Sequence, residues 1–518
     1  MKICHLKIIG LHHKEIMLDL AGAESYTPIY FIGQNGSYKS TVIEIIYAIF
    51  ASYDAPSVIN KYGIDYELGY IIHGKKVLII KQTENYSVTV NCLDEGFHSL
   101  KSVSIDVLRR NLKKWGVLPV RIISFYAGEN DRIQRISKNA LRGYKIKVNN
   151  IIKDIMDDKS VKIPLNYLHK RYFHGDNNLI PLLLVKAFNG GDNSRDVLKE
   201  TCHVESLNEI VFFTELTMKN KKVLSVEKAE KVISGFFPYA KYEIVETPKK
   251  DTRDNPRKYY RICYEFNKER DNLSDVYELY DFISFVFDGT IRTYFKTSEE
   301  RDVIIDDTQL SQGQRQWIKI VGLLSLVNDE DSIVLMDEPD AFMNPVWKYQ
   351  FHEIIKTVLG GACPGVNLIV THDPLLINGV PKEQIRIFEK TGNEVLIQEP
   401  INDTYGLGID GILRSSYYGL ATTYDQETSQ KYYKRMILYS KAINNELTDK
   451  SEKRELFDLT KELGSLPVFN SSIDYLYLDF LKAYEESDLA QKEYLTLEEV
   501  EEKKKTIQEI LRNLFEGY

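Results

Sequence analysis

The chain has 518 residues, of which 43% are hydrophobic and 27% charged, a composition typical of a globular protein with several domains or one core with large insertions. The formal net charge of -8 excludes overall basicity as a route to nucleic acid, although local basic patches remain open. Five widely spaced cysteines without zinc-ligand spacing, no signal peptide and no long apolar run lead us to expect a cytoplasmic protein without a membrane span.

The first elements lead into a glycine-containing loop. Alternating residues in 2–10 and 13–20 predict two half-buried strands, and the apolar run 28–32 predicts a buried strand that ends at Gly33. Residues 41–51 place apolar side chains on one face of a helix. The loop between that strand and that helix reads Gly33-Gln34-Asn35-Gly36-Ser37-Tyr38-Lys39-Ser40-Thr41. This order of strand, loop and helix predicts a phosphate-binding loop, the Walker A motif.

The residue types in this loop predict ATP and Mg²⁺ as its ligands. Backbone N–H groups at the start of a helix point at phosphates, and the helix dipole favours their charge. Lys39 is expected to reach the β- and γ-phosphates and Ser40 to ligate Mg²⁺. The full set of expected nucleotide-binding residues is Asn35, Gly36, Ser37, Tyr38, Lys39, Ser40 and Thr41.

Tyr38 departs from the usual pattern, which has Gly immediately before the lysine. Glycine there allows free backbone dihedrals and a close approach of the phosphates, whereas tyrosine adds a Cβ and a ring. The donors are backbone groups, so we expect ATP binding to survive and hydrolysis to be slow.

A basic segment follows the first half of this core. Residues 62–98 and 120–125 predict further strands, and the stretch after Phe125 carries no glutamine that could serve the nucleotide. Residues 132–147 then contain no acidic residue and six basic ones: Arg132, Arg135, Lys138, Arg142, Lys145 and Lys147. Such a run could follow the backbone of DNA or RNA, or it could be a solvated helix face, and both interpretations stay open.

The region 129–300 is longer than a compact ATPase core needs between its motifs, which predicts an insertion. It mixes helical patterns with a predicted hairpin formed by 242–246 and 258–266. It lacks sustained heptads, so it is not a long coiled coil.

The second motif is Leu310-Ser311-Gln312-Gly313-Gln314. It opens a helix with Ser311 as the expected N-cap and resembles the signature motif of ATPases that sandwich ATP between two subunits. This anion site has no phosphate partner in its own chain. We therefore expect a head-to-tail dimer in which Ser311, Gly313 and Gln314 bind the ATP of the other copy.

The third motif supplies the expected catalytic groups. The apolar run 333–336 places Asp337 and Glu338 at the end of a buried strand, the Walker B position. Asp337 would hold Mg²⁺ together with Ser40, and Glu338 would orient and deprotonate the attacking water. His372 follows the apolar strand 366–370 and is placed to sense the γ-phosphate.

Together the motifs predict an α/β fold. It is an ABC-type ATPase with a mixed sheet and flanking helices, a large α+β insertion and a helical C-terminal region. The predicted division is 1–128 with Walker A, 129–300 as insertion, 301–402 with signature, Walker B and His372, and 403–518 as helices ending in a capped helix at 496–518. No Asp-x-Asp pair follows His372 and the ten histidines show no metal-binding arrangement, so we expect an ATPase that is not itself a nuclease.

With these residues in place, the chain resembles the PtuA-type ATPases of Septu antiphage systems, including retron-associated ones. The resemblance covers 1–128 and 301–425, and it is strongest where Asp337-Glu338-Pro339-Asp340 leads into 344–349. It implies a cytosolic bacterial defence complex of dimers or higher oligomers with a separately encoded HNH nuclease, PtuB. In retron versions it also implies a reverse transcriptase with its RNA–DNA product.

Two other classes remain as alternatives. One is a RecF- or Rad50-like repair ATPase that binds DNA, although Rad50 proteins have the long coiled coil that this sequence lacks. The other is the ATPase subunit of a transporter, which the large insertion disfavours.

Overall fold

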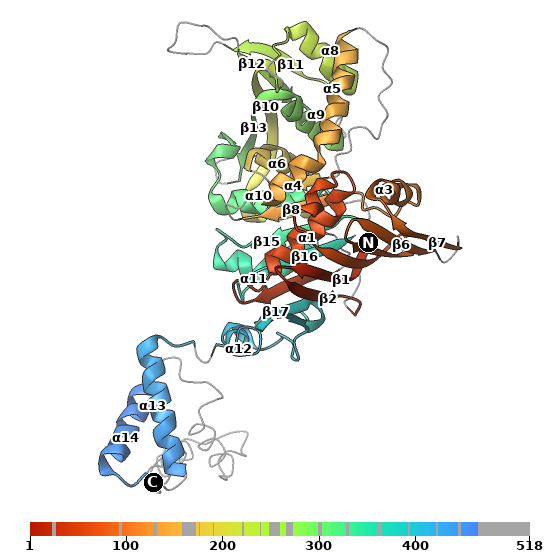
Figure 1. Ribbon diagram of the computed structural model, residues 1–518. Helices are drawn as coiled ribbons and strands as arrows, with labels where there is room; N and C mark the ends of the chain where they lie inside the picture. Colours follow the sequence, from red (N-terminus) through yellow and green to blue (C-terminus); the bar gives the residue numbers. More distant parts are fainter. Residues whose placement is uncertain are drawn as a thin grey trace. The chain divides into compact units, whose positions relative to one another are not determined.

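The structure is a computed structural model with two compact units, Met1–Gly419 and Leu420–Tyr518, which are described separately (Figure 1). The described residues are 1–22, 27–92, 96–127, 132–157, 172–175, 177–189, 191–219, 222–238, 240–247, 259–265, 273–298, 303–327, 331–359, 365–391, 394–420, 423–443 and 447–464.

The first unit is built on a 13-stranded mixed sheet with the order β7-β6-β5-β4-β1-β2-β18-β17-β3-β16-β15-β8-β9. Its last six strands are parallel: β17 (Ile385–Thr391), β3 (Pro28–Gly33), β16 (Val366–Val370), β15 (Ile333–Asp337), β8 (Ile122–Tyr126) and β9 (Tyr172–His174). β15 and β16 are buried along their whole length, as expected for parallel strands covered on both faces. Because their carboxyl ends meet at one edge, the loops that follow them can share one site.

The other strands form an antiparallel extension of the sheet. They are β1 (Lys2–Leu11), β2 (Lys14–Asp19), β4 (Asp65–Ile72), β5 (Lys75–Gln82), β6 (Asn85–Cys92) and β7 (Gly96–Val103). The hairpin of β17 and β18 (Glu394–Gln398) joins this extension to the parallel part. The strands predicted for 2–10 and 13–20 are confirmed as β1 and β2. The short helix α2 (Ser57–Asn60) precedes β4, and α3 (Ile105–Lys114) lies against β6 and β7.

Successive residues of β3 face two different hydrophobic cores. Tyr30 packs in the core that contains α6 (Ile180–Asn189) and α10 (Gln312–Leu324), whereas Phe31 packs in the core around α1 (Lys39–Ser52). Gly33 ends β3 with φ 136°, and a Cβ there would lie 2.2 Å from the carbonyl oxygen of Phe388 in β17. Only glycine allows the loop to leave the sheet at this point.

The insertion contributes a second, antiparallel sheet of five strands in the order β11-β12-β10-β13-β14. These are β11 (Glu243–Thr247), β12 (Tyr259–Glu265), β10 (Val204–Met218), β13 (Phe287–Thr297) and β14 (Ile304–Asp306). The predicted hairpin is confirmed as β11 paired with β12. Helices α5 (Arg142–Met156), α8 (Val226–Phe236) and α9 (Leu273–Val286) accompany this sheet (Figure 1).

Buried helices connect the insertion to the ATPase core. α6 (Ile180–Asn189) and α7 (Asp192–Cys202) pack on α10 (Gln312–Leu324), and one hydrophobic core runs through all three. A Cβ on Gly322 in α10 would lie 2.5 Å from the carbonyl oxygen of Leu183 in α6, so these helices approach at backbone distance. The insertion therefore shares its core with the ATPase.

The C-terminal elements fall into both units. α11 (Pro345–Val358) and α12 (Gly408–Arg414) belong to the first unit, and α13 (Gln426–Ile443) and α14 (Lys450–Gly464) form a pair in the second. The helix predicted at 496–518 lies outside the described residues. The four-part division by motif stays a prediction; the structure separates its units after Gly419. None of the helices in the described ranges is both long and apolar enough to cross a membrane.

Candidate nucleotide-binding site

The phosphate-binding loop joins β3 to α1. Its sequence predicts a positive φ at glycine but not at Tyr38. Gly36 has φ 78°, and Tyr38, the N-cap of α1, has φ 73° and ψ 9°. This left-handed conformation costs a non-glycine residue about 1–2 kcal/mol. Tyr38 therefore adopts the conformation that glycine would take freely, at a cost in strain.

The ring of Tyr38 packs against the turn between β1 and β2. Its centroid lies 6.2 Å from that of the His12 ring and 5.7 Å from the Nζ of Lys14. His12 and His13 both have positive φ, at 49° and 63°. The sequence analysis missed these residues, because only the pairing of β1 with β2 brings this turn beside the loop.

Lys39 folds back over the loop. Its ammonium donates to the carbonyl oxygens of Gly33 at 2.8 Å and Gln34 at 2.9 Å, and to the Oγ of Ser37 at 3.2 Å. Burial lowers the pKa of Lys39 to about 8, against the opposing effect of Asp337 and Glu338. The hydrogen-bond partners of this cation are neutral oxygens, which a phosphate could replace with negative charge.

Ser40 and Asp337 form the expected metal position. The hydroxyl of Ser40 donates to Oδ1 of Asp337 at 3.0 Å, and Asp337 is only 2% exposed. Burial raises the pKa of Asp337 to about 7, with a further increase from Glu338 and a decrease from the Ser40 hydrogen bond. Hard oxygen donors of this kind suit Mg²⁺, and a bound cation would compensate the desolvated carboxylate. The two residues therefore fit the metal.

Glu338 and His372 lie next to each other at the ends of β15 and β16. The Nε2 of His372 is 3.8 Å from Oε1 of Glu338, whose side chain is 51% exposed. Burial, together with Lys39, lowers the pKa of His372, so the imidazole is neutral near pH 7. The structure thus brings these two residues to the same sheet edge as Ser40 and Asp337.

A charged network ties the loop after Walker B to the loop after β16. Lys348 in α11 is 2.7 Å from Oδ2 of Asp373 and 3.7 Å from Oδ2 of Asp340. The hydroxyl of Thr371 donates to Oδ1 of Asp340 at 3.1 Å. Burial raises the pKa of Asp340, and Lys348 opposes that effect. This lysine therefore holds together two loops that flank Glu338.

Tyr126 and Glu44 border the site although sequence reasoning did not select them. Tyr126 ends β8 in register with Asp337 of β15, and burial and the charge of Asp337 raise its pKa. Glu44 is 5% exposed on α1, accepts a hydrogen bond from Tyr62, and lies 3.6 Å from a guanidinium nitrogen of Arg132. A buried glutamate one turn after Ser40 was the available signal, hidden among apolar neighbours.

The basic segment forms parts of two helices, α4 (Arg132–Ala140) and α5. Arg132, Arg135, Lys138, Arg142 and Lys147 are exposed. Lys145 is half-buried, with its Nζ 5.6 Å from the ring of Phe285. Contact with nucleic acid stays a prediction for these residues.

The signature residues form the start of α10. The Oγ of Ser311 accepts from the N–H of Gln314 at 3.3 Å, and the Gln314 side chain accepts from the N–H of Ser311 at 3.0 Å. A Cβ on Gly313 would lie 3.1 Å from both the carbonyl oxygen of Phe342 and the ring of Trp347. Within the described ranges, no hydrogen bond or ion pair joins Ser311, Gly313 or Gln314 to the phosphate-binding loop.

A cavity of about 520 Å³ lies beside the loop. It is lined by Gly33, Gln34, Asn35 and His372, by the end of β17, and by residues 416–419. The hydroxyl of Tyr418 is enclosed and has no hydrogen-bond partner among the described residues, and burial raises its pKa. The segment after α12 therefore contributes to the wall of the site, which the sequence analysis did not foresee.

Comparison of the sequence with known proteins finds a relative from a defence system. A curated relative, the Septu protein PtuA of Bacillus mycoides (strain KBAB4), is 28% identical over 166 residues, which make up 30% of this chain and 22% of that relative. This match confirms the resemblance to PtuA over part of the chain, and the matched region is less than a quarter of the relative's length.

Comparison with solved structures finds head domains of SMC proteins at low identity. The SMC head domain from Thermotoga maritima is 10% identical with a TM-score of 0.33 over 78% of this chain and 100% of that one. An Smc head domain with an extended coiled coil, bound to the C-terminal domain of ScpA and derived from Pyrococcus furiosus, is 11% identical with a TM-score of 0.32 over 77% of this chain and 96% of that one.

The match that covers most of the ATPase motifs is to a family model. It is described as "AAA domain, putative AbiEii toxin, Type IV TA system" and matches residues 30–378, from β3 to just beyond His372. More than half of the chain is matched, and the chain belongs to this family of ATPase domains.

Proposed function

We propose that the chain is the ATP-binding and ATP-hydrolysing regulatory subunit of a bacterial antiphage defence complex. The observation that carries the proposal is the meeting of Lys39, the Ser40–Asp337 pair, and the Glu338–His372 pair at one edge of the parallel strands. The similarity to Septu protein PtuA supports the defence role.

In this proposal each residue of the site has a separate task. Backbone N–H groups of Asn35–Thr41 bind the phosphates, and protonated Lys39 exchanges its carbonyl partners for the β- and γ-phosphates. Ser40 and Asp337 would hold Mg²⁺, which would supply positive charge to the phosphates. Glu338 is exposed and takes a proton from the attacking water. Neutral His372 forms a hydrogen bond with the γ-phosphate.

The site is completed by a second copy of the chain. The signature residues make no hydrogen bond to the loop of their own chain within the described ranges, and Ser311 is exposed. Phe342, Val346 and Tyr349 are also exposed, by 65%, 62% and 59%, around the loop that contacts Gly313. An apolar surface of this kind beside an incomplete anion site favours a head-to-tail dimer that buries ATP.

The proposed partner is a separately encoded HNH nuclease, PtuB-like, in the cytosol. ATP-bound dimers would hold the nuclease in one arrangement, and loss of that state would free it. A reverse transcriptase with its RNA–DNA product would join the complex in a retron setting. These partners rest on the resemblance to PtuA.

Sedimentation of Glu338→Gln with and without ATP tests the proposal. This variant retains the groups that bind ATP and should form a dimer with it. It lacks the base that deprotonates the attacking water, so ATP is not hydrolysed and stays bound. Lys39→Ala should stay in its nucleotide-free state under both conditions. The proposal is wrong if ATP leaves the association state of Glu338→Gln unchanged while binding to it.

The exposed basic residues of α4 and α5 favour one second candidate, a repair-type ATPase that binds DNA. Binding of duplex DNA that weakens steeply with salt and is lost on charge removal in α4 would support it. Equal binding by wild type and such a variant would exclude this surface.

A further inference from the structure

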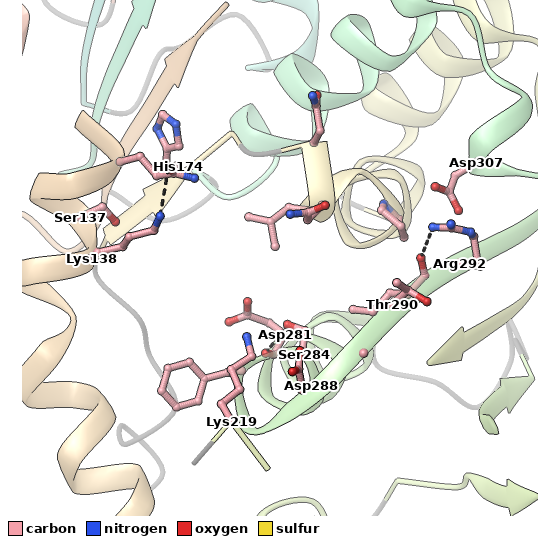
Figure 2. Close-up of a pocket in the computed structure, with 18 of the residues that line it drawn as sticks. Ser137, Lys138, His174, Lys219, Asp281, Ser284, Asp288, Thr290, Arg292 and Asp307 are labelled. Carbon is pink, nitrogen blue, oxygen red and sulfur yellow. Dashed lines mark hydrogen bonds between the residues drawn. The ribbon is translucent and has the colours of Figure 1, made fainter. Parts of the chain in front are cut away.

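A second cavity, of about 610 Å³, lies between the ATPase core and the inserted sheet (Figure 2). Its walls come from α4, α9, α10, β13, the end of β10 and the short helices η2 (Asn177–Leu179) and η3 (Asp307–Gln309). Elements from the insertion and from the second half of the ATPase therefore meet around one polar space. The cavity lies away from the residues of the phosphate-binding loop.

Basic side chains reach this cavity from four elements: Lys138 on α4, Lys219 after β10, Arg292 on β13 and Arg315 on α10. Figure 2 shows Lys138 with His174 on one side, Arg292 with Asp307 on the opposite side, and Lys219 with Asp281 and Asp288 along a third. Four cations converging on one space are a common design for binding phosphate groups.

Arg315 is the cavity residue that connects most directly to the signature motif in sequence. It follows Gln314 of the signature motif directly, and it lines the cavity. Its Nε is enclosed and has no hydrogen-bond partner in the part of the chain that the structure describes. Enclosed polar atoms in proteins are almost always hydrogen-bonded, and a guanidinium most often pairs with an anion.

Three carboxylates, those of Asp281, Asp288 and Asp307, line the cavity together with the four cations. Asp307 is 2% exposed and accepts a hydrogen bond from the N–H of Thr293 at 3.0 Å, so this carboxylate stabilises the folded structure. Burial raises the pKa of Asp307, so this carboxyl loses its proton less readily than an exposed one. Asp288 is exposed. Among the charged groups near Asp307, Arg292 lowers its pKa and Asp306 raises it.

We propose that this cavity binds a small phosphorylated ligand of nucleotide size, at a site separate from the one at Lys39. Arg292 and Arg315 bind the phosphate, because a guanidinium presents several N–H donors in a plane that matches phosphate oxygens. The side chains of Asn177, Thr290 and Thr308 supply donors and acceptors for a sugar or base. The volume lies within the range of small-molecule sites.

Two of the helices that line this cavity, α4 and α10, also lead to the nucleotide site. α4 carries Lys138 at the cavity and Arg132 beside Glu44 of α1, and α10 carries both Arg315 and the signature motif. His174, in the cavity wall, is 3.0 Å from the hydroxyl of Ser124 on β8, the strand that ends beside Asp337. A ligand in the cavity therefore regulates how the two halves of the ATPase engage ATP.

Calorimetric titration of the full chain carrying Lys39→Ala tests the proposal, since that substitution weakens phosphate binding at the first site. The probes are AMP, inorganic phosphate, a 5′-phosphorylated dithymidine dinucleotide and the same dinucleotide without phosphate. Arg315→Gln and Arg292→Gln are each added in turn. Arg110→Gln, on exposed α3, is the matched control.

We expect AMP or the phosphorylated dinucleotide to bind, and either pocket substitution to weaken binding at least about tenfold, while Arg110→Gln leaves it unchanged. AMP as the tighter probe identifies a free nucleotide as the ligand; the phosphorylated dinucleotide alone identifies a nucleic-acid end. The thermal midpoint of each variant without probe, compared with its parent, separates lost binding from lost folding. Absence of binding by all probes, or binding that both pocket variants retain, would overturn the proposal.

Discussion

The hydroxyl of Ser40 donates a hydrogen bond to Asp337 over 3.0 Å, although the two residues stand 297 positions apart in the chain. β3 delivers Ser40 and β15 delivers Asp337, with only β16 between these strands in the sheet. The insertion lies between these two residues in the sequence, yet Ser40 and Asp337 are in contact in the folded chain.

Replacement of this carboxylate should stabilise the nucleotide-free protein and abolish its activity. The folded pKa of Asp337, about 7, is raised above its ordinary value of 3.8, so the folded state binds the proton more tightly. Its contribution to stability is full below about pH 4 and is lost as the pH rises to about 7. Asp337→Asn should therefore raise the free energy of unfolding by about 1–4 kcal/mol at pH 8.

Denaturant titration at pH 4 and pH 8 measures this difference, which should vanish at the lower pH. The same variant should lose metal-dependent ATP hydrolysis by at least about a hundredfold. An equal stability gain at both pH values would contradict the titration as its cause.

ATP affinity should weaken as the pH rises through about 8. Lys39 has its pKa lowered to about 8 by burial, so the nucleotide-free protein loses this positive charge in mildly alkaline solution. Phosphate binding requires the protonated form. Lys39→Arg should remove the pH dependence, because a guanidinium stays charged. Fluorescence titration with a labelled ATP between pH 6.5 and 9.5 measures it, and parallel curves for both proteins would refute the explanation.

Tyr38→Gly should increase the turnover of ATP by several-fold and keep binding. The substitution removes a side chain from a left-handed position that costs about 1–2 kcal/mol, and glycine lets phosphates approach the backbone. Steady-state hydrolysis and binding measured on the same preparation test it. Loss of nucleotide binding would instead show that packing of the ring with His12 and Lys14 is required.

Lys348→Met should lower the free energy of unfolding by about 1–3 kcal/mol and slow hydrolysis. The change leaves Asp340 and Asp373 without the cation that joins their loops beside Glu338. Lys356→Met on the same helix is the control, because its pair with Glu353 is exposed and should matter by less than about 0.5 kcal/mol. Equal effects of the two substitutions would show that the loss of stability comes from replacing any lysine of α11, and not from the contacts of Lys348 with Asp340 and Asp373.

The purified chain should not cut DNA or RNA with Mg²⁺ or Mn²⁺. The sequence shows no Asp-x-Asp pair after His372, and the carboxylates at the sheet edge are those of a nucleotide site. Gel assays of the purified chain with labelled DNA and RNA check this. Metal-dependent cleavage by the isolated chain that is lost on mutation of a carboxylate other than Asp337 or Glu338 would overturn it.

The sequence by itself determined the local parts of this protein. The strand before Gly33, the helix after Lys39, the Ser311 cap and the strand before Asp337 follow from hydrophobic periodicity and short-range hydrogen bonding, which neighbouring residues decide. The order of the motifs was enough to indicate an ATPase, since each one needs few residues at fixed spacing.

Only the tertiary structure decided which distant groups meet. The pairing of β8 with β15 sets Tyr126 beside Asp337, and the approach of α4 to α1 sets Arg132 beside Glu44. The cavity at Arg315 depends on the inserted sheet, in which strands that are distant from one another in the sequence form pairs. No local pattern encodes such contacts, because they are fixed by the burial of shared hydrophobic faces between elements that are remote in sequence.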